Sequence, residues 1–257
     1  MKKMILFLTA VFLLAGITHA ESIGIVVAVQ GNAVAADASG TVRKLALQSD
    51  VFLNDTIKTE PASRLQIMLN DDSLIAQGES SEMTIDEYVY NPGKASDNAF
   101  GAKLGKGLFR TVTGKITDLN PDRFAVKTAR ATIGIRGCDL GFNITSGEDN
   151  ISIMAIPAGK KIFIDPVAGG QSLMVENPSF VTVDDRGMIQ QRDLTSADRG
   201  AAQQGTTPGA AAPMINSSDV NTIEGDIIGG GVTGGGESLI DQGTIIQDTA
   251  QGESYGP

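Results

Sequence analysis

Residues 123–144 have the sequence RFAVKTARATIGIRGCDLGFNI, and this stretch decides the fold class. Apolar residues alternate there with polar or small residues in three short runs. The apolar positions are Phe124 and Val126, then Ile133 and Ile135, and then Leu140, Phe142 and Ile144. A period of two over a few residues, interrupted by glycine or other small residues, is typical of half-buried strands. The stretch therefore predicts β-strands.

Similar short runs recur from Ile23 to about Arg192, and turn residues separate them. Ile23–Val29 precedes Gly31-Asn32, for example, and Ile151–Ile156 stops at Pro157. No longer window keeps an apolar stripe at the helical period of about 3.6 residues. Many short strands with regularly spaced turns predict an all-β fold, either a short-strand β-sandwich or a solenoid-like roll.

The N-terminus has the features of a signal peptide at residues 1–20. Lys2 and Lys3 form a basic region, residues 4–17 are almost continuously apolar, and Ala20 offers a small residue before the cleavage point. A retained anchor is the alternative, but the apolar run is shorter than the ~20 residues that a spanning helix needs. We expect a periplasmic or secreted protein that starts at Glu21 and has no membrane span after cleavage.

Cleavage would limit the chemistry that the chain can perform. It would remove His19, the only histidine, and the loss of Lys2 and Lys3 would take the net charge from −10 to −12. Catalysis by Ser-His-Asp or Cys-His sets and zinc sites of the Cys/His kind are then excluded within one chain. Carboxylate-only catalysis and oxygen-ligated calcium remain open. The sequence predicts no cofactor, no metal and no catalytic residue, and the acidic charge argues against nucleic acid as a partner.

Four motifs between Asp50 and Ile144 resemble, in order and spacing, those of the FecR-type periplasmic domain. Asn54–Thr59 is similar to its G-D-x-I-x-T segment, and Arg64–Ser73 to its s-x-a-x-l-x-l-x-D-G-s hairpin. Gly105–Arg110 is similar to its l-x-x-G-x-v-r strand, and residues 124–142 to its f-x-v-x-T-p-x-a-x-i-x-v-R-G-T-x-f-x-v run. The motif residues with an implied structural role are Asp55, Thr59, Asp71, Thr128, Gly137 and Cys138.

Three positions depart from these motifs. Asn54 and Asp72 replace glycines, and both suit turns because Asn and Asp tolerate a positive φ better than other side chains. Cys138 replaces the usual Thr, and we expect it to be buried as a small apolar residue. A reactive thiol or an intermolecular disulfide is the alternative. Gly137 should supply a bulge or a close backbone approach where the strand breaks, and Arg136 should pair with a carboxylate.

The family includes anti-sigma regulators that have a cytoplasmic domain, one spanning helix and this domain in the periplasm. The present sequence shows a leader in place of the first two parts. The resemblance therefore implies a free-standing exported form that keeps the fold and a protein-interaction role. We do not carry over sigma-factor regulation.

Basic residues are concentrated between positions 103 and 136, although the chain as a whole is acidic. The candidates for partner binding are Lys103, Lys106, Arg110, Lys115, Arg123, Lys127, Arg130 and Arg136, against only Asp118 and Asp122 in the same stretch. They form either outward strand positions paired with carboxylates from elsewhere or a basic face that contacts an acidic partner or an anionic envelope polymer.

The domain boundaries follow from the decay of the strand pattern. We expect a signal peptide at 1–20, a FecR-like β domain at 21–195 with its motif core at 50–144, and a disordered Gly/Ala/Ser-rich tail at 196–257. Short apolar clusters in that tail are either incidental or strands that add to a partner's edge.

Together these features predict a non-enzymatic exported protein that binds another protein or senses a signal in the cell envelope. The alternative is a carboxylate-based hydrolase that acts on envelope polysaccharide or peptidoglycan. It would require two carboxylates within about 10 Å in a deep pocket.

Overall fold

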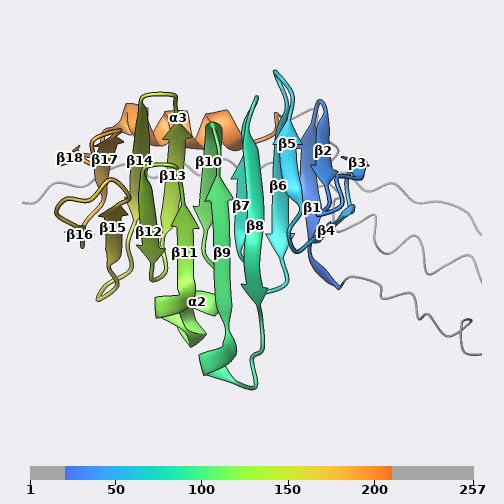
Figure 1. Cartoon of the computed structure of the whole chain (residues 1–257), viewed down its shortest axis with the longest axis horizontal. Helices are drawn as coiled ribbons and strands as arrows, with labels where there is room; N and C mark the ends of the chain where they lie inside the picture. Colours follow the sequence, from blue (N-terminus) through green and yellow to red (C-terminus); the bar gives the residue numbers. More distant parts are fainter. Residues whose placement is uncertain (1–20, 210–257) are drawn as a thin grey trace, which may run out of the picture. The chain divides into compact units, whose positions relative to one another are not determined.

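The computed structural model describes residues 21–209, which form two β-sheets stacked face to face (Figure 1). Each sheet has nine strands. We name them sheet A, in the order β18-β17-β14-β13-β10-β7-β6-β1-β4, and sheet B, in the order β16-β15-β12-β11-β9-β8-β5-β2-β3. The all-β prediction is confirmed, in its sandwich form.

The strands are short, as the turn spacing predicts. Sheet A contains β1 (Ser22–Gln30), β4 (Asp50–Phe52), β6 (Arg64–Leu69), β7 (Leu74–Gln77), β10 (Gly107–Val112), β13 (Asp139–Ile144), β14 (Glu148–Ala155), β17 (Ser179–Asp184) and β18 (Ile189–Asp193). Sheet B contains β2 (Ala33–Ala36), β3 (Val42–Leu45), β5 (Thr56–Thr59), β8 (Glu82–Val89), β9 (Ala99–Leu104), β11 (Phe124–Lys127), β12 (Ala131–Ile135), β15 (Ile162–Pro166) and β16 (Leu173–Val175).

One continuous hydrophobic core fills the space between the sheets. It takes alternate residues from both, for example Phe109 and Phe142 from sheet A and Ile133 from sheet B. Phe100 and Phe124 stack with their ring centroids 4.2 Å apart across β9 and β11. These two strands are the only parallel neighbours in the part of the chain that the structure describes.

The three runs of the opening stretch become β11, β12 and β13, and the last two lie in different sheets. The change of sheet takes place at Gly137, whose φ is +99°. A Cβ there would meet no atom closer than 3.6 Å. Glycine is therefore required for its backbone conformation, and crowding plays no part.

Gly137→Val is expected to lower the free energy of unfolding by about 1–3 kcal/mol, because a β-branched residue is strained at positive φ. Gly134→Val is the matched control, since Gly134 lies in β12 and an added Cβ there would come no nearer than 3.8 Å to another residue. Urea unfolding of both variants measures the difference. A Gly137→Val protein as stable as its parent would contradict the structural role.

Within residues 21–209, four helical segments connect or cover the sheets. They are η2 (Ala95–Asp97), α2 (Ile116–Leu119), η3 (Pro121–Arg123) and α3 (Ser196–Thr206). Helix α3 crosses the outer face of sheet A along one edge of the sandwich (Figure 1). No helix between residues 21 and 209 is long and apolar enough to cross a bilayer.

Helix α3 corrects the expected start of the tail at residue 196. Thr195 caps the helix through a capping box with Asp198, and Arg199 donates a 2.7 Å hydrogen bond to the Met154 carbonyl of β14. Gly141 allows α3 to pack closely on β13, since a Cβ on Gly141 would lie 2.5 Å from Cβ of Ala202. The sequence prediction missed α3 because it is attached by caps, polar bonds and small residues. The predicted signal peptide and the rest of the predicted tail, residues 210–257, lie outside the described residues.

Candidate functional site

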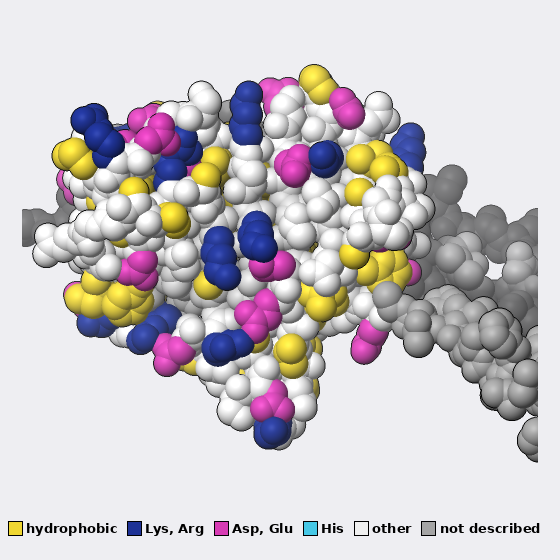
Figure 2. Space-filling view, in the orientation of Figure 1, with side chains coloured by type: hydrophobic (Ala, Val, Ile, Leu, Met, Phe, Trp, Pro, Cys, Tyr) yellow, Lys and Arg dark blue, Asp and Glu magenta, His cyan; other side chains and the backbone are white. Residues whose placement is uncertain are grey.

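The eight basic candidates lie on several faces of the sandwich. Arg110 is on the outer face of sheet A, opposite in direction to buried Phe109. Lys103 and Lys127 are on the outer face of sheet B, where Lys/Arg and Asp/Glu side chains alternate over the surface (Figure 2). The eight residues therefore do not form one basic face.

Six of the eight pair with carboxylates, as the first of the two interpretations expects. The pairs are Lys103–Asp86, Arg110–Asp139, Lys115–Asp72, Arg123–Glu87, Arg130 with Asp149 and Asp185, and Arg136–Asp122. Lys106 and Lys127 have no carboxylate oxygen within 4.0 Å among residues 21–209. Whether any of these residues binds a partner stays a prediction.

Arg130 is the exception in its burial, since its side chain is only 9% exposed. Its guanidinium bonds Asp149 at 2.9 Å and Asp185 at 2.6 Å, and it also donates to the carbonyls of Thr145 and Ser146. Thr145 and Ser146 belong to the turn after β13, Asp149 to the start of β14 and Asp185 to the turn after β17, whereas Arg130 follows β11. The side chain therefore connects turns of the two sheets.

The motif residues also form internal contacts. Buried Asp55 accepts bonds from the guanidinium of Arg43 and from the backbone N–H of Phe52. The Thr59 hydroxyl donates to the Gly78 carbonyl and accepts from the Ser81 N–H. The bond from Phe52 is local to the turn after β4, whereas the contacts of Asp55 with Arg43 and of Thr59 with Gly78 and Ser81 join separate segments of the chain.

Thr128 and Asp71 act in the same way in other parts of the fold. The Thr128 hydroxyl donates to Asp149 and accepts from the backbone N–H groups of Arg130 and Ala131. Asp71 joins the β6–β7 turn to Tyr88 of β8 and to Ile116 at the start of α2. These motif residues therefore stabilise turns and hold them against neighbouring segments.

Cys138 is buried and free within the described part of the chain. Burial, with a smaller contribution from Asp139, raises the pKa of its thiol far above the usual range. The group therefore stays a neutral thiol at neutral pH, which favours the expected packing role.

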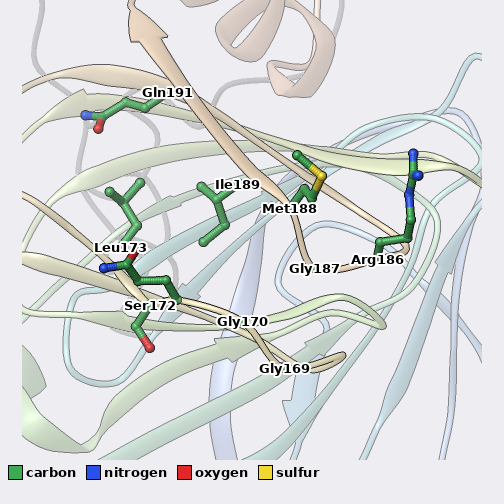
Figure 3. A pocket seen from close by; sticks show the side chains of 10 residues that line it. Gly169, Gly170, Ser172, Leu173, Arg186, Gly187, Met188, Ile189 and Gln191 are labelled. Carbon is green, nitrogen blue, oxygen red and sulfur yellow. The ribbon is translucent and has the colours of Figure 1, made fainter.

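A groove lies at one end of the sandwich (Figure 3). It has a volume of about 520 Å³ and lies between the edge strand of sheet A, β18, and the edge strand of sheet B, β16. Leu173 and Ile189 line it from the two strands. Met188 also lines it and is 56% exposed.

Glycines close one end of this groove. Gly187, in the β17–β18 turn, has a φ of +76°, and a Cβ on it would lie 2.5 Å from the Gly169 carbonyl oxygen of the β15–β16 loop. The sequence analysis did not identify the groove, because it depends on two edge strands meeting across the sandwich. The run Gly169-Gly170 and Met188 were the signals available.

The carboxylates that line the cavity beside α2 are paired with basic groups. A cavity of about 560 Å³ beside α2 is lined by Asp72, Asp118 and Asp139. Their partners are Lys115, Lys160 and Arg110 respectively. In residues 21–209, no three His, Cys, Asp or Glu side chains gather where they could hold a metal ion.

A model of the FecR protein family matches residues 55–156. The chain contains a FecR domain. The match overlaps the expected motif core at 50–144 and ends where β14 ends. The FecR domain, β5 to β14, forms the middle of both sheets, while β1–β4 extend one end and β15–β18 extend the other. The groove between β16 and β18 therefore lies outside the matched region.

Two crystal structures of a candidate anti-sigma factor from Parabacteroides distasonis, at 1.65 and 2.50 Å resolution, are similar to the chain. Each shares 14% identity with a TM-score of 0.45, over 58% of this chain. The alignments cover 65% and 64% of the solved chains, so this chain spans less than two thirds of their length. No curated protein matches the sequence.

Proposed function

We propose that this protein is a non-enzymatic, exported interaction module of the cell envelope. The groove between β16 and β18 would bind an extended segment of a partner protein. The FecR domain and the signal-peptide pattern at residues 1–20 support the location. The groove supports the mode of binding, and it is the observation that carries the proposal.

The groove suits strand addition for two reasons. β16 and β18 are edge strands, and each pairs with only one neighbour in residues 21–209, so their outer backbone groups are open to another strand. Leu173, Ile189 and the exposed Met188 add an apolar surface for side chains of such a segment. Methionine adapts its shape easily and is frequent at binding surfaces.

The hydrolase alternative receives less support from the geometry. Catalysis by two carboxylates needs one that can act as an acid and one that stays ionised and accessible. Asp72, Asp118 and Asp139 each face a basic partner in an open cavity. Hydrolysis of purified envelope polymers that is lost in Asp118→Asn and Asp139→Asn would revive this alternative.

A photo-cross-linking amino acid at Met188 is expected to capture a defined envelope protein in the native host. Val42 is the matched control, because it is an exposed apolar residue (62%) on the edge strand at the opposite end of the sandwich. Adding Leu173→Asp, in the lining of the groove, should reduce the Met188 cross-link about tenfold or more, since a buried unpaired charge costs well over 1.4 kcal/mol.

Mass spectrometry identifies the captured protein, and thermal melts confirm that the variants are folded. Equal capture from positions 188 and 42, or capture that survives Leu173→Asp, would exclude the groove as the binding site.

A further inference from the structure

A cavity lies between helix α3 and the outer face of sheet A. Its volume of about 390 Å³ falls within the range of small-molecule sites. Strands β10, β13, β14, β17 and β18 contribute its floor, and Ala201 and Ala202 of α3 contribute one side. Arg192 of β18 belongs to this outer face, whereas Ile189 of the same strand packs against the core. The cavity is therefore separate from the groove between β16 and β18.

A row of uncharged polar side chains crosses the floor of the cavity. The strand register places Asn143 of β13 opposite Asn150 of β14, and Asn150 opposite Thr182 of β17. The Asn150 amide accepts a 2.9 Å bond from the Thr182 hydroxyl and donates a 2.9 Å bond to Glu148. The Asn143 side chain lines the cavity and forms no hydrogen bond within residues 21–209. Its amide can therefore both donate to a ligand and accept from one.

Ser152 gives the strongest indication of a ligand. Its neighbours Ile151 and Ile153 lie in the core, so Ser152 points to the outer face of sheet A. The residue is only 7% exposed, lines the cavity and forms no side-chain hydrogen bond with another described residue. Buried hydroxyls in native proteins nearly always have a partner. Water can supply that partner in the free protein, and a ligand hydroxyl can replace the water.

The same cavity has apolar surface and no unpaired charge among its lining residues. Leu108 and Phe180 are half-buried and line it from β10 and β17. The two charged lining residues, Arg192 and Asp198, neutralise each other through two hydrogen bonds of 2.7 and 2.9 Å. The Arg192 guanidinium also lies 3.8 Å from the ring centroid of Phe180.

This combination fits a neutral sugar. A charged ligand would find no free counter-charge in the cavity, and an apolar ligand would leave Asn143 and Ser152 without partners. A hexopyranose offers hydroxyls that donate and accept, and C–H groups that pack against apolar side chains. We propose that the cavity between α3 and sheet A binds a neutral hexopyranose unit of an oligosaccharide. The inference concerns binding without hydrolysis and does not depend on the function proposed for the other groove.

Nuclear magnetic resonance titration of the ¹⁵N-labelled full chain, without its predicted signal peptide, tests this assignment. The probes are maltohexaose, cellohexaose and chitohexaose, which are neutral, and hexagalacturonate, which is acidic. At least one neutral probe is expected to bind with a Kd of about 1 mM or lower and to shift the side-chain amide signals of Asn143 and Asn150. Asn177 is the internal control, because it is exposed and lies outside the cavity.

Two variants with matched controls locate the binding site. Ser152→Ala should raise the Kd about five- to tenfold, as expected for the loss of one hydrogen bond. Ser146→Ala, at an exposed serine outside the cavity, should leave the Kd unchanged. Ala201→Trp should abolish binding by filling the cavity. Gln203→Trp should not, because residue 203 is exposed and points about 200° around the helix from residue 201. Thermal melts confirm that the variants are folded.

Four results would overturn the proposal. They are no binding of any neutral probe at mM concentrations, tighter binding of hexagalacturonate than of the neutral probes, signal shifts centred on Leu173 and Ile189 of the other groove, and variants at positions 152 and 201 that bind like their controls. Photo-cross-linking at Met188 reports separately on the other groove, so failure of one proposal leaves the other intact.

Discussion

Arg130→Ala is expected to lower the free energy of unfolding by about 3–5 kcal/mol, the range found when one member of a buried ion pair is removed. The reason is the position of its partner. Asp149 is fully buried, and Arg130 supplies the only cation within 4.0 Å of it in the described chain. After the substitution, Asp149 would remain as an uncompensated charge in a medium of low dielectric.

The loss should extend beyond one charge. Arg130 also bonds the carbonyls of Thr145 and Ser146 and the carboxylate of Asp185. These contacts hold the β13–β14 and β17–β18 turns of sheet A against the β11–β12 turn of sheet B. Hydrogen exchange in these three turns should rise more than in the strands that they join.

Arg123→Ala is the matched control for this prediction. Arg123 also pairs with a carboxylate, Glu87, but both side chains are about half exposed. Exposed ion pairs contribute about 0–1 kcal/mol. The double variant Arg130→Met with Asp149→Leu should recover much of the stability, because it removes both charges together. If Arg130→Ala and Arg123→Ala unfold at the same urea concentration, the buried ion pair between Arg130 and Asp149 does not stabilise the fold.

The sequence predicted the regular parts of this fold, because strand alternation and turn chemistry are local. Phe124, Ile133 and Leu140 mark three successive strands by their spacing alone. Asn54 and Asp72 were expected in turns with positive φ, and they have φ values of +67° and +66°. These positions follow from steric rules that act within a few residues.

The features that the sequence did not reveal depend on distant partners. In the sequence, Arg130 is one of eight similar basic residues. What distinguishes it is its contact with Asp149, which lies 19 residues away along the chain. Helix α3 carries no apolar stripe. It packs against β13 at Gly141, where there is no side chain to obstruct it. The groove between β16 and β18 requires the order of both sheets. Pattern analysis along one chain contains none of these distances.

The second large prediction concerns Asp71 and Asp72, which are neighbours in the same turn but differ in burial. Asp71 is fully buried. Its carboxylate accepts bonds from the hydroxyl and N–H of Ser73, from the N–H of Ile116 and from the hydroxyl of Tyr88. Burial, reinforced by Asp71, raises the pKa of Tyr88 well above its usual range, so the phenol stays protonated and can donate.

Asp71→Ala is expected to lower the free energy of unfolding by about 3–4 kcal/mol, since it leaves several buried donors without an acceptor at about 1–3 kcal/mol each. The turn is closely packed, so the backbone has little room to rearrange after the substitution. A Cβ on Gly114 would lie 2.2 Å from the Asp71 carbonyl oxygen, so the backbone cannot easily move to provide other acceptors. Thermal and urea unfolding measure the loss.

Asp72 should behave in the opposite way. Its side chain is 63% exposed, and it pairs only with the exposed Lys115. Asp72→Gly removes that weak pair but also relieves the positive φ of +66°, so the unfolding free energy should stay within about 1 kcal/mol of the parent. Asp72→Val should instead cost about 1–2 kcal/mol, because a β-branched residue resists this conformation. The unfolding free energy should be highest for Asp72→Gly, lower for Asp72→Val and lowest for Asp71→Ala. Any other order would mean that Asp71 does not stabilise this turn.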